Sequence, residues 1–416
     1  MHILWVKNEL LHPLDKGGRI RTYEMLRRLR DHHRVSYVAL DDGTTTAEQR
    51  ARAREYCDDL VLVPWRRAPL RGWRRGLAIL RNVVSSLPFA LAPYRSAAMT
   101  RVIRERCTEG DARADVVVCD FLVPALNVPA GLPCPVVLFQ HNVEAMIWER
   151  RTRVAANPVM RLYMAEQWRR MRRVEREQCL RFDHVVAVSP EDAAVFRSAY
   201  GVEHVSSVPT GVDTDFFRPS GAVAQATASI VFTGSMDWMP NEDGMVFFVD
   251  EVLPRIERAV PEASLTIVGR NPTARVRALA DRNPRVTVTG TVPDVRPYLE
   301  SASVVVVPLR VGGGTRIKIY EAMGMERAVV STTIGAEGLD VADGEHIVLA
   351  DDPASFADAV IALLRAPERA AAVGRSAAAH VRAHFGWASV AEQFAERCSA
   401  AASRQERPSS VMSLSS

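Results

Sequence analysis

Lysine, closely spaced cysteines and long apolar runs are scarce in this sequence of 416 residues. Of its 53 basic residues, only Lys7, Lys16 and Lys318 are lysines. The six cysteines form no Cys-x-x-Cys pair and no cluster with histidine at metal-ligand spacing, which excludes zinc and iron–sulfur centres. The cysteines lie mostly in apolar runs, and we expect them to be reduced core thiols of a cytosolic protein. No window approaches the roughly 20 apolar residues of a membrane-spanning helix.

The common phosphate-binding fingerprints are missing as well. No Gly-x-Gly-x-x-Gly follows the first predicted strand of either half, and the lysine motif of phosphate-loop ATPases is absent. These absences argue against a nicotinamide dehydrogenase and against a phosphate-loop ATPase. The first residues lack a basic start followed by an apolar core, so we expect a cytoplasmic protein whose membrane contact, if it has one, is peripheral and at the inner face.

Short apolar runs rich in β-branched residues alternate with helical patterns along the sequence. Most runs are continuously apolar, as in parallel strands that are covered on both faces. The alternation occurs twice, which predicts the α/β class with two Rossmann-like, doubly wound domains facing across a cleft. The predicted strands are 2–6, 34–40, 60–63, 115–119, 136–140 and 184–188, then 229–233, 264–268, 285–289, 303–307, 328–331 and 346–349.

A segment without strand or helix character, near 216–227, separates the two halves. We expect one domain over 1–215, a second over 216–385, a helix over 386–398 and a disordered tail, rich in serine and alanine, over 399–416. A helix over 161–181 would place Leu162, Met171 and Val174 on one apolar face.

The most informative stretch is a glycine-rich loop that follows the predicted strand 303–307. Gly312, Gly313 and Gly314 allow a ligand to approach the main chain closely, and Thr315 is placed to cap a helix that runs to about residue 323. Arg316 and Lys318 lie in the first turn of this helix, where cations are unfavourable unless an anion compensates them. The pattern therefore predicts a phosphate site. Glu321, one turn later, would accept hydrogen bonds from a ribose diol or form an ion pair with Lys318.

This stretch resembles the nucleotide-binding motif of the family-four retaining glycosyltransferases, which have the GT-B fold. Further segments agree in order and spacing, from residue 2 to about 390. They are KGGRIRTYEMLRRL (16–29), FQHNVEA (139–145), VVAVSPED (185–192), VPTGVDTDFFRP (208–219), GSMDWMPNEDG (234–244), IVGR (267–270) and GTVPDVRPYLESASVVVVPL (290–309).

The resemblance implies an acceptor-side N-terminal domain, a C-terminal domain that binds a nucleotide sugar, and a role for each matching residue. His141 would sit near the reacting sugar, Glu321 would hold the ribose, and the main chain of Thr291 and Val292 would contact the base. The residues implied to lie near the donor phosphates are Lys16, Gly17 and Gly18 in the loop after the first strand, Gly234, Asp237 and Asn241 after the first strand of the second domain, and Gly269 and Arg270 of the IVGR segment.

Two departures from the family pattern matter. Gly313 stands eight positions before Glu321, where the family has a glutamate that touches the donor sugar, so the identity of the sugar does not carry over. The family often has an arginine and a lysine after the first strand of the second domain, where this chain reads GSMDWMPN. We expect Arg316 and Lys318 to neutralise the diphosphate instead.

Plainer interpretations compete with several of these roles. His141 lies in an apolar context, where a histidine is often structural. Asp237 and Asn241 could be helix caps, and Lys7 is more readily explained as a solvated charge at a strand end than as a ligand.

The stretch 60–104 contains nine arginines and no acidic residue. A solvated basic face is the default explanation for such a run. A peripheral contact with an anionic membrane is the sharper hypothesis. Nucleic acid is not an expected partner, because no recognised binding module accompanies the charge.

Together these observations predict an enzyme that moves a sugar from a UDP- or GDP-sugar to a hydroxyl of a sugar, lipid-linked or small-molecule acceptor. The resemblance implies retention of configuration, no metal and no cofactor, in the biosynthesis of a polysaccharide, glycolipid or glycoconjugate. A sugar-nucleotide epimerase or hydrolase of the same fold, and a noncatalytic protein that binds nucleotide sugars, are the alternatives.

Overall fold

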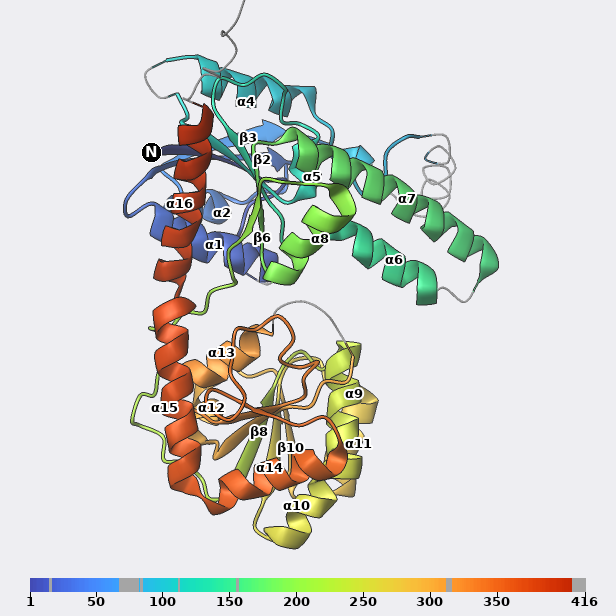
Figure 1. Ribbon diagram of the computed structural model, residues 1–416, viewed down its shortest axis with the longest axis vertical. Coiled ribbons are helices and arrows are strands. Elements are labelled where there is room, and N and C mark those ends of the chain that lie inside the picture. The colour runs from blue at the N-terminus through green and yellow to red at the C-terminus, as the bar shows by residue number, and fades with distance from the viewer. Residues whose placement is uncertain are drawn as a thin grey trace, which may run out of the picture. The chain divides into compact units, whose positions relative to one another are not determined.

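The computed structural model describes residues 1–14, 17–66, 82, 85–110, 113–154, 157–311 and 316–405 (Figure 1). The chain forms two compact units, and one of them contains both ends of the chain. Unit 1 comprises Met1–Pro209 and Val390–Ser416, and unit 2 comprises Thr210–Ser389. The chain therefore passes from unit 1 to unit 2 and back again.

Unit 1 is built around a seven-stranded parallel sheet with the strand order β3-β2-β1-β4-β5-β6-β7. Its strands are β1 (His2–Val6), β2 (Arg34–Asp41), β3 (Asp59–Pro64), β4 (Val116–Asp120), β5 (Val136–Phe139), β6 (His184–Ala187) and β7 (Val205–Ser207). The first six match the predicted strands closely, and β7 was not predicted. The α-helices are α1 (Gly17–Leu29), α2 (Ala47–Arg52), α4 (Ala97–Thr108), α5 (Leu122–Ala125), α6 (Glu144–Val154), α7 (Pro158–Arg181) and α8 (Pro190–Tyr200).

Unit 2 contains a six-stranded parallel sheet with the strand order β10-β9-β8-β11-β12-β13. Its strands are β8 (Ser229–Thr233), β9 (Ser264–Val268), β10 (Val286–Gly290), β11 (Val304–Val307), β12 (Val329–Ser331) and β13 (Val348–Leu349). The α-helices are α9 (Met239–Phe247), α10 (Leu253–Ala259), α11 (Ala274–Arg282), α12 (Arg296–Ser301), α13 (Ile317–Gly324), α14 (Pro353–Arg365) and α15 (Pro367–His384). All six strands were predicted, and the two sheets confirm the doubly wound α/β class.

The inner strands of each sheet are buried because their sequences are apolar on both faces. Every residue of β4 and of β11 is buried, and helices cover the two sides of each sheet. All six cysteines are free thiols inside this packing, which confirms their prediction as reduced core residues.

The strand order of each sheet reverses between two neighbouring strands. In unit 1 the reversal lies between β1 and β4, and in unit 2 it lies between β8 and β11. In open α/β sheets, ligands bind beyond the carboxyl ends of the strands at such a switch point. The residues that follow these four strands are therefore the first candidates for a site.

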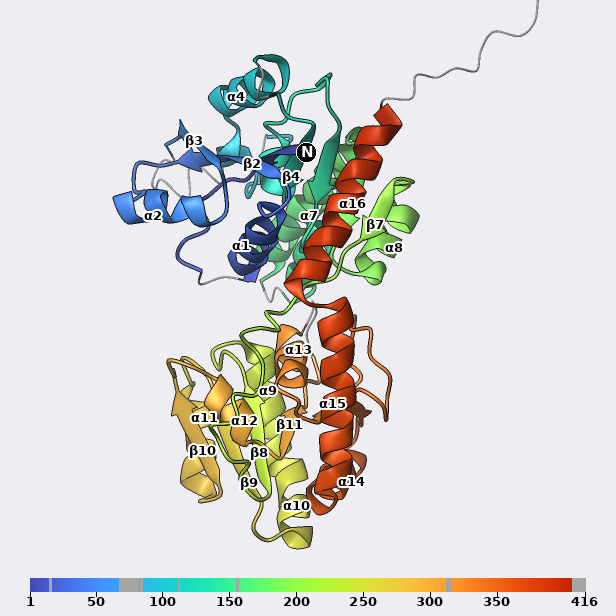
Figure 2. The same cartoon turned by 90° about the vertical axis from the view of Figure 1, so that its left-hand side faces the viewer.

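The last helix, α16 (Trp387–Gln405), corrects the prediction for the end of the chain. The predicted helix 386–398 is present, but residues 399–405 continue it and are not a disordered tail; residues 406–416 lie outside the described ranges. Phe394 of α16 packs against Trp5 and Phe139, with ring centroids 5.5 and 4.9 Å apart, which attaches the helix to the sheet of unit 1 (Figure 2). Cys398 and Ala401 are buried further along the helix, so its packing continues past the predicted end.

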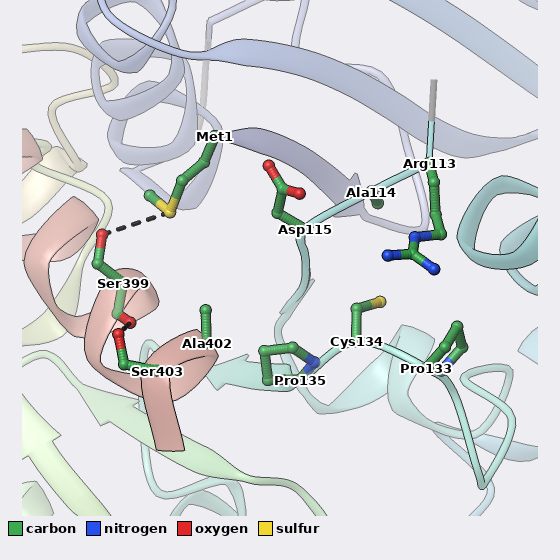
Figure 3. Close-up of a pocket in the computed structure, with 10 residues that line it drawn as sticks. All are labelled: Met1, Arg113, Ala114, Asp115, Pro133, Cys134, Pro135, Ser399, Ala402 and Ser403. Carbon is green, nitrogen blue, oxygen red and sulfur yellow. Dashed lines mark hydrogen bonds between the residues drawn. The ribbon is translucent and has the colours of Figure 1, made fainter. Parts of the chain in front are cut away.

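A pocket of about 390 Å³ lies between α16, Met1 and the residues that precede β4 and β5 (Figure 3). Because it is at the amino ends of these strands, it lies at the opposite edge of the sheet from the switch point. Its lining residues are Met1, Arg113, Ala114, Asp115, Pro133, Cys134, Pro135, Ser399, Ala402 and Ser403.

Candidate functional site

The predicted residues of unit 2 gather at the carboxyl edge of its sheet. Gly234 directly follows β8, Gly269 follows β9, and Thr291 follows β10. Helix α13 carries Lys318 and follows the loop after β11. Part of the predicted site lies outside the described residues: the glycine-rich loop, with Gly312, Gly313, Gly314 and Thr315, and also Lys16.

Lys318 is joined to the loop after β8. Its Nζ donates a hydrogen bond of 2.9 Å to Asn241 Oδ1, and Asn241 Nδ2 donates one of 2.8 Å to the carbonyl of Ser235. A Cβ on Gly234 would lie 2.6 Å from Lys318 Nζ, so the glycine leaves room for the ammonium. Burial lowers the pKa of Lys318 to about 7; Glu321 opposes this shift and Arg316 adds to it. Among the described residues no carboxylate forms an ion pair with this ammonium, so a bound anion would be its direct counter-charge.

Helix α13 also carries Glu321 and is preceded by Arg316. The helix begins at Ile317, and Arg316, which is 4% exposed, lies with Cζ 5.9 Å from the centre of the Trp238 ring. Burial raises the pKa of Glu321 to about 7, although Lys318 opposes the shift. Since Lys318 donates to Asn241 on α9, the ammonium is held towards the switch point.

Asp237 belongs to an exposed cluster beside this loop. Ser235 Oγ donates to Asp237 Oδ1 at 2.5 Å and accepts from Arg270 Nε at 3.0 Å, and Asn271 Nδ2 donates to Asp237 Oδ2 at 3.1 Å. Helix α9 begins at Met239 after Trp238, which makes no side-chain cap, and Asn241 lies inside the helix. The capping interpretation of Asp237 and Asn241 is therefore wrong.

Three further predicted positions are Gly269, whose place has a steric explanation, and Thr291 and Val292, which lie apart from Lys318. A Cβ on Gly269 would lie 1.6 Å from the carbonyl oxygen of Gly234, so this glycine lets the loops after β8 and β9 cross. Thr291 and Val292 follow β10, which is the outer strand of the sheet and two strands away from β8. Thr291 is exposed and Val292 is partly buried against the core.

In unit 1, the switch point is occupied by Asp120, a residue that belongs to none of the sequence motifs. Its Oδ2 accepts hydrogen bonds from Lys7 Nζ at 2.6 Å, Thr22 Oγ1 at 2.7 Å and Trp5 Nε1 at 3.1 Å. Burial opposes ionisation, but Lys7 and His141 outweigh it and hold the pKa of Asp120 well below its usual range. The available signal was an aspartate that ends a buried apolar strand, VVVCD.

Lys7 is 1% exposed and ion-paired with Asp120, so its prediction as a solvated strand-end charge is wrong. It follows β1, and its backbone N–H continues the pairing with β2 by donating to the carbonyl of Val38 at 3.0 Å. Burial lowers the pKa of Lys7, against the attraction of Asp120. The ammonium lies inside the unit because the neighbouring strand supplies its counter-charge.

His141 follows β5 and shares the same carboxylate. Its Nε2 lies 2.7 Å from Asp120 Oδ1, and the Phe121 ring stacks on the imidazole with centroids 3.8 Å apart. Burial lowers the pKa of His141 to about 3, although Asp120 opposes the shift. The imidazole is therefore neutral near pH 7.

Gly17 and Gly18 are the first residues of α1 and not part of a loop, which corrects the prediction. A Cβ on Gly18 would lie 2.8 Å from Phe121 Cζ, whereas one on Gly17 would meet nothing within 4 Å. The Gly18 carbonyl accepts a hydrogen bond of 2.9 Å from Thr22 Oγ1. Gly18 thus makes space for the ring that covers His141.

Among the described side chains, no three histidine, cysteine, aspartate or glutamate residues gather closely enough to hold a metal ion. Within the same ranges, no helix combines the length and apolar character that crossing a membrane requires.

Two parallel Rossmann-like sheets in separate units, each with polar residues at its switch point, define the GT-B class of folds. Family models agree with this assignment: one described as Glycosyltransferase Family 4 matches residues 16–216, and one described as Glycosyl transferases group 1 matches residues 227–366. The chain belongs to the family-four glycosyltransferases.

Curated relatives match about half of the chain. D-inositol 3-phosphate glycosyltransferase 2 of Catenulispora acidiphila is 27% identical over 237 residues, which cover 51% of this chain and 55% of the relative. Phosphatidyl-myo-inositol mannosyltransferase of Mycobacterium tuberculosis is 31% identical over 201 residues, which cover 45% and 51%. The chain thus spans about half the length of the curated relatives that it matches.

Solved structures resemble the whole chain in fold. The Anabaena protein HepE in complex with UDP aligns with a TM-score of 0.66 at 15% identity, covering 96% of this chain and 100% of HepE. At this identity the likeness concerns the fold.

Proposed function

We propose that this protein transfers a sugar from a nucleotide diphosphate sugar to an acceptor hydroxyl with retention of configuration. The observation that supports the proposal most strongly is the position of Lys318 at the switch point of unit 2. There its ammonium is hydrogen-bonded to Asn241 and lies next to Gly234. HepE has the same fold and is named in complex with UDP, which supports a nucleotide as the donor's leaving group.

In this mechanism, cleavage of the glycosidic bond builds negative charge on the diphosphate. The ammonium of Lys318, the guanidinium of Arg316 and the N-terminal end of α13 stabilise that charge without a metal. The leaving oxygen then takes the proton of the acceptor hydroxyl on the same face of the sugar, which accounts for retention. Glu321 binds the ribose.

A donor panel identifies the base and the sugar. UDP, GDP, ADP and TDP and their sugars are compared by thermal shift, because a ligand that binds the folded state raises the midpoint by mass action. Transfer is then assayed with the stabilising donor. The acceptor panel includes D-inositol 3-phosphate and phosphatidyl-myo-inositol, which the names of the two relatives indicate as their acceptors.

The decisive variant replaces Arg316 and Lys318 together by methionine. We expect an unchanged unfolding midpoint without ligand, and a loss of several orders of magnitude in turnover. Near-normal turnover would refute the proposed role of both cations. Full-rate release of free nucleotide without an acceptor would instead indicate an epimerase or hydrolase, and donor binding without turnover a noncatalytic protein.

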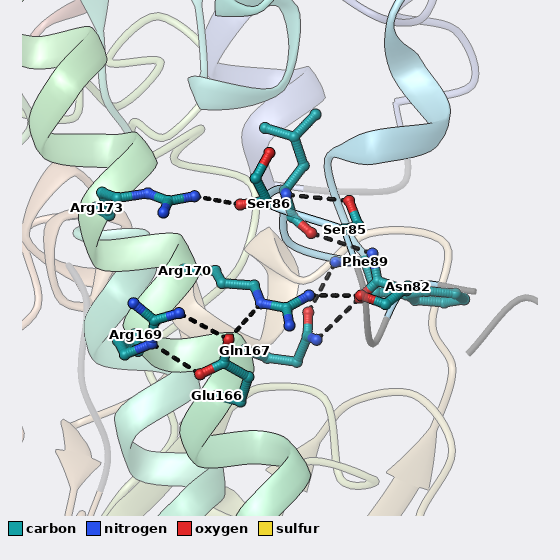
Figure 4. A network of polar contacts seen from close by, with 10 residues as sticks. Asn82, Ser85, Ser86, Phe89, Glu166, Gln167, Arg169, Arg170 and Arg173 are labelled. Atoms are coloured by element: carbon teal, nitrogen blue, oxygen red, sulfur yellow. Dashed lines mark hydrogen bonds and ion pairs between the residues drawn. The ribbon is translucent and has the colours of Figure 1, made fainter. Parts of the chain in front are cut away.

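We also propose that unit 1 contacts an anionic bilayer. The basic stretch 60–104 has residues 67–81, 83 and 84 outside the described ranges, but Asn82 and Ser86 attach its remainder to α7 (Figure 4). Gln167 Nε2 donates to Asn82 Oδ1 at 3.0 Å, Arg170 donates to the Asn82 carbonyl at 2.5 Å, and Arg173 donates to the Ser86 carbonyl. Asn82, Ser86 and Phe89 of this stretch are thereby held against the middle of α7.

The amino-terminal turns of α7 add exposed apolar side chains to this region. Val159, Met160 and Leu162 are 77%, 48% and 75% exposed, which corrects the prediction that Leu162 shares the buried face of Met171 and Val174. Exposed apolar side chains that flank the exposed Arg161 on the same helix are suited to the interfacial region of an anionic membrane, where each basic residue contributes ~1 kcal/mol.

Vesicle sedimentation tests this contact. The wild-type protein is expected to sediment with phosphatidylserine-containing vesicles at low salt and not with neutral ones. Val159→Ser combined with Leu162→Ser should weaken this binding, while Leu180→Ser, at a 43% exposed position near the other end of α7, should not. Equal binding to anionic and neutral vesicles rejects the proposal.

A further inference from the structure

The Asp120 carboxylate connects three strands of unit 1 at one point. It ends β4, its Oδ2 accepts from Lys7 beyond β1, and its Oδ1 lies 2.7 Å from His141 Nε2 beyond β5. Thr22 of α1 and Trp5 of β1 complete its hydrogen bonds. Asp120 is fully buried, so these partners replace the water that an ionised carboxylate requires.

This arrangement determines which nitrogen of His141 carries the proton. An ionised carboxylate only accepts hydrogen bonds, so the 2.7 Å contact requires a proton on Nε2. Lys7 already neutralises Asp120, and Arg21 adds further positive charge near the imidazole, so a second proton on the ring is unfavourable. Nδ1 therefore carries a lone pair, and it is buried without a hydrogen-bond partner among the residues that the structure describes.

Phe121 fixes the plane of the imidazole. The two rings are stacked with an interplanar angle of 15°, and Lys7 Nζ lies 4.3 Å from the centre of the Phe121 ring. Phe121 has φ 75° and ψ 167°, a conformation that a residue with a side chain rarely adopts. Such backbone strain persists where the surroundings demand it, and it is concentrated at functional sites. Here the strained residue directly follows Asp120.

We propose that Asp120 and Phe121 are positioning residues that hold His141 as the neutral Nε2–H tautomer, so that Nδ1 accepts a hydrogen bond from a hydroxyl of the bound sugar. The inference rests on the proposed function for the identity of the sugar, but not for the tautomer. It assigns His141 the role of an acceptor that orients a hydroxyl. The imidazole would not supply a positive charge to the diphosphate.

Nuclear magnetic resonance of the full chain with ¹⁵N-labelled histidine tests the tautomer directly. His141→Gln assigns the signal by its disappearance. We expect a neutral Nε2–H pattern that does not change between pH 5 and 8, because burial lowers the pKa of His141 to about 3. A neutral Nδ1–H pattern, or titration near the ordinary histidine value of about 6.5, would overturn the proposal. Neither result depends on transfer activity.

A paired substitution tests the link to turnover. Asp120→Asn combined with Lys7→Met removes both charges and avoids a buried unpaired lysine. We expect a mixture of tautomers and a fall in kcat of at least about 100-fold, with the donor KM changed less than about threefold. Phe121→Leu, which keeps an apolar side chain but no ring, is expected to lower kcat with the tautomer retained.

An unchanged kcat in both variants would overturn the positioning roles. If the wild-type protein shows no transfer with any donor, the proposed function fails, and the wild-type histidine spectrum still decides the tautomer. If the paired variant does not fold, the same spectrum and Phe121→Leu decide the inference.

Discussion

Gly234 and Lys318 meet at the switch point of unit 2, where a Cβ on the glycine would lie 2.6 Å from the lysine Nζ. The two residues come from the loop after β8 and from the helix that follows β11. They are neighbours because these strands are paired in the sheet. The glycine therefore determines where the ammonium can lie, and the ammonium is the charge on which the proposed donor site depends.

We predict that Gly234→Ala impairs donor binding without unfolding the protein. The added Cβ would collide with the end of the Lys318 side chain and, at 2.7 Å, with Asn241 Nδ2, and both groups can move aside. Displacement of the ammonium should raise the Kd for the nucleotide about tenfold, which corresponds to ~1.4 kcal/mol. Isothermal titration measures the Kd. An unchanged Kd with the donor identified by the panel would contradict the prediction.

Gly269→Ala is predicted to affect stability instead. Its Cβ would lie 1.6 Å from the carbonyl oxygen of Gly234, and a main-chain atom cannot rotate away as a side chain can. We expect a loss of roughly 2–4 kcal/mol in the free energy of unfolding, as for other severe steric substitutions. Urea unfolding of the two alanine variants side by side checks this, because only Gly269→Ala should shift the midpoint strongly.

Donor binding should take up protons through Lys318. Burial lowers the pKa of this ammonium to about 7 in the free protein, and a bound diphosphate would raise it. The affinity should therefore fall as the pH rises above 7. At pH 8 the terminal phosphate of a free nucleotide diphosphate, with a pKa of about 6, is already ionised, and a nucleotide diphosphate sugar has no such group. Titrations with either ligand in two buffers of different ionisation enthalpy should therefore show proton uptake by the protein. Lys318→Met should abolish the uptake, and an unchanged uptake would assign it to another group.

The fold could be predicted from sequence because the inner strands of its sheets are covered on both faces. A continuously apolar run such as β11, Val304–Val307, can be identified as a buried strand without knowing which strands pair with it. Strand β7 was not predicted because it has only three residues, two of them serines, and lies at the edge of its sheet. The end of α16 was not predicted because its serine and alanine content is typical of a disordered tail, whereas alanine also favours helix and Cys398 and Ala401 are buried there.

Only those site residues that belong to recognisable sequence motifs were predicted. Asn241 and Lys318 belong to recognisable segments, and the structure brings them together. Asp120 and Phe121 have no local signal of comparable strength, because their importance arises from the pairing of β4 with β1. The same pairing buries Lys7 beside Asp120, 113 residues away along the chain, and this distance explains why the exposure of Lys7 was predicted wrongly.

Glu175 is expected to stabilise the loop that carries His141. Its carboxylate accepts hydrogen bonds from the N–H groups of Glu144 and Ala145 at 2.7 and 3.0 Å, from Tyr200 Oη at 2.8 Å and from Gln140 Nε2 at 3.2 Å. An amide has only one oxygen to accept from these donors. Glu175→Gln should therefore lower the free energy of unfolding by about 1–3 kcal/mol, because buried donors lose their acceptor.

Urea unfolding of this variant at neutral pH measures the loss. Glu177→Gln, on the exposed side of the same helix, is the matched control, with an expected change within about 0.5 kcal/mol.

The pH dependence of stability gives a second test of Glu175. Burial raises the pKa of Glu175 to about 7, so its protonated form favours folding at low pH, and that contribution is lost as the pH rises through 7. Between the ordinary glutamate pKa of 4.5 and about 7, the free energy of unfolding of the wild-type protein should fall relative to that of Glu175→Gln. Parallel pH profiles would show that Glu175 is ionised throughout and that its four hydrogen bonds outweigh its burial.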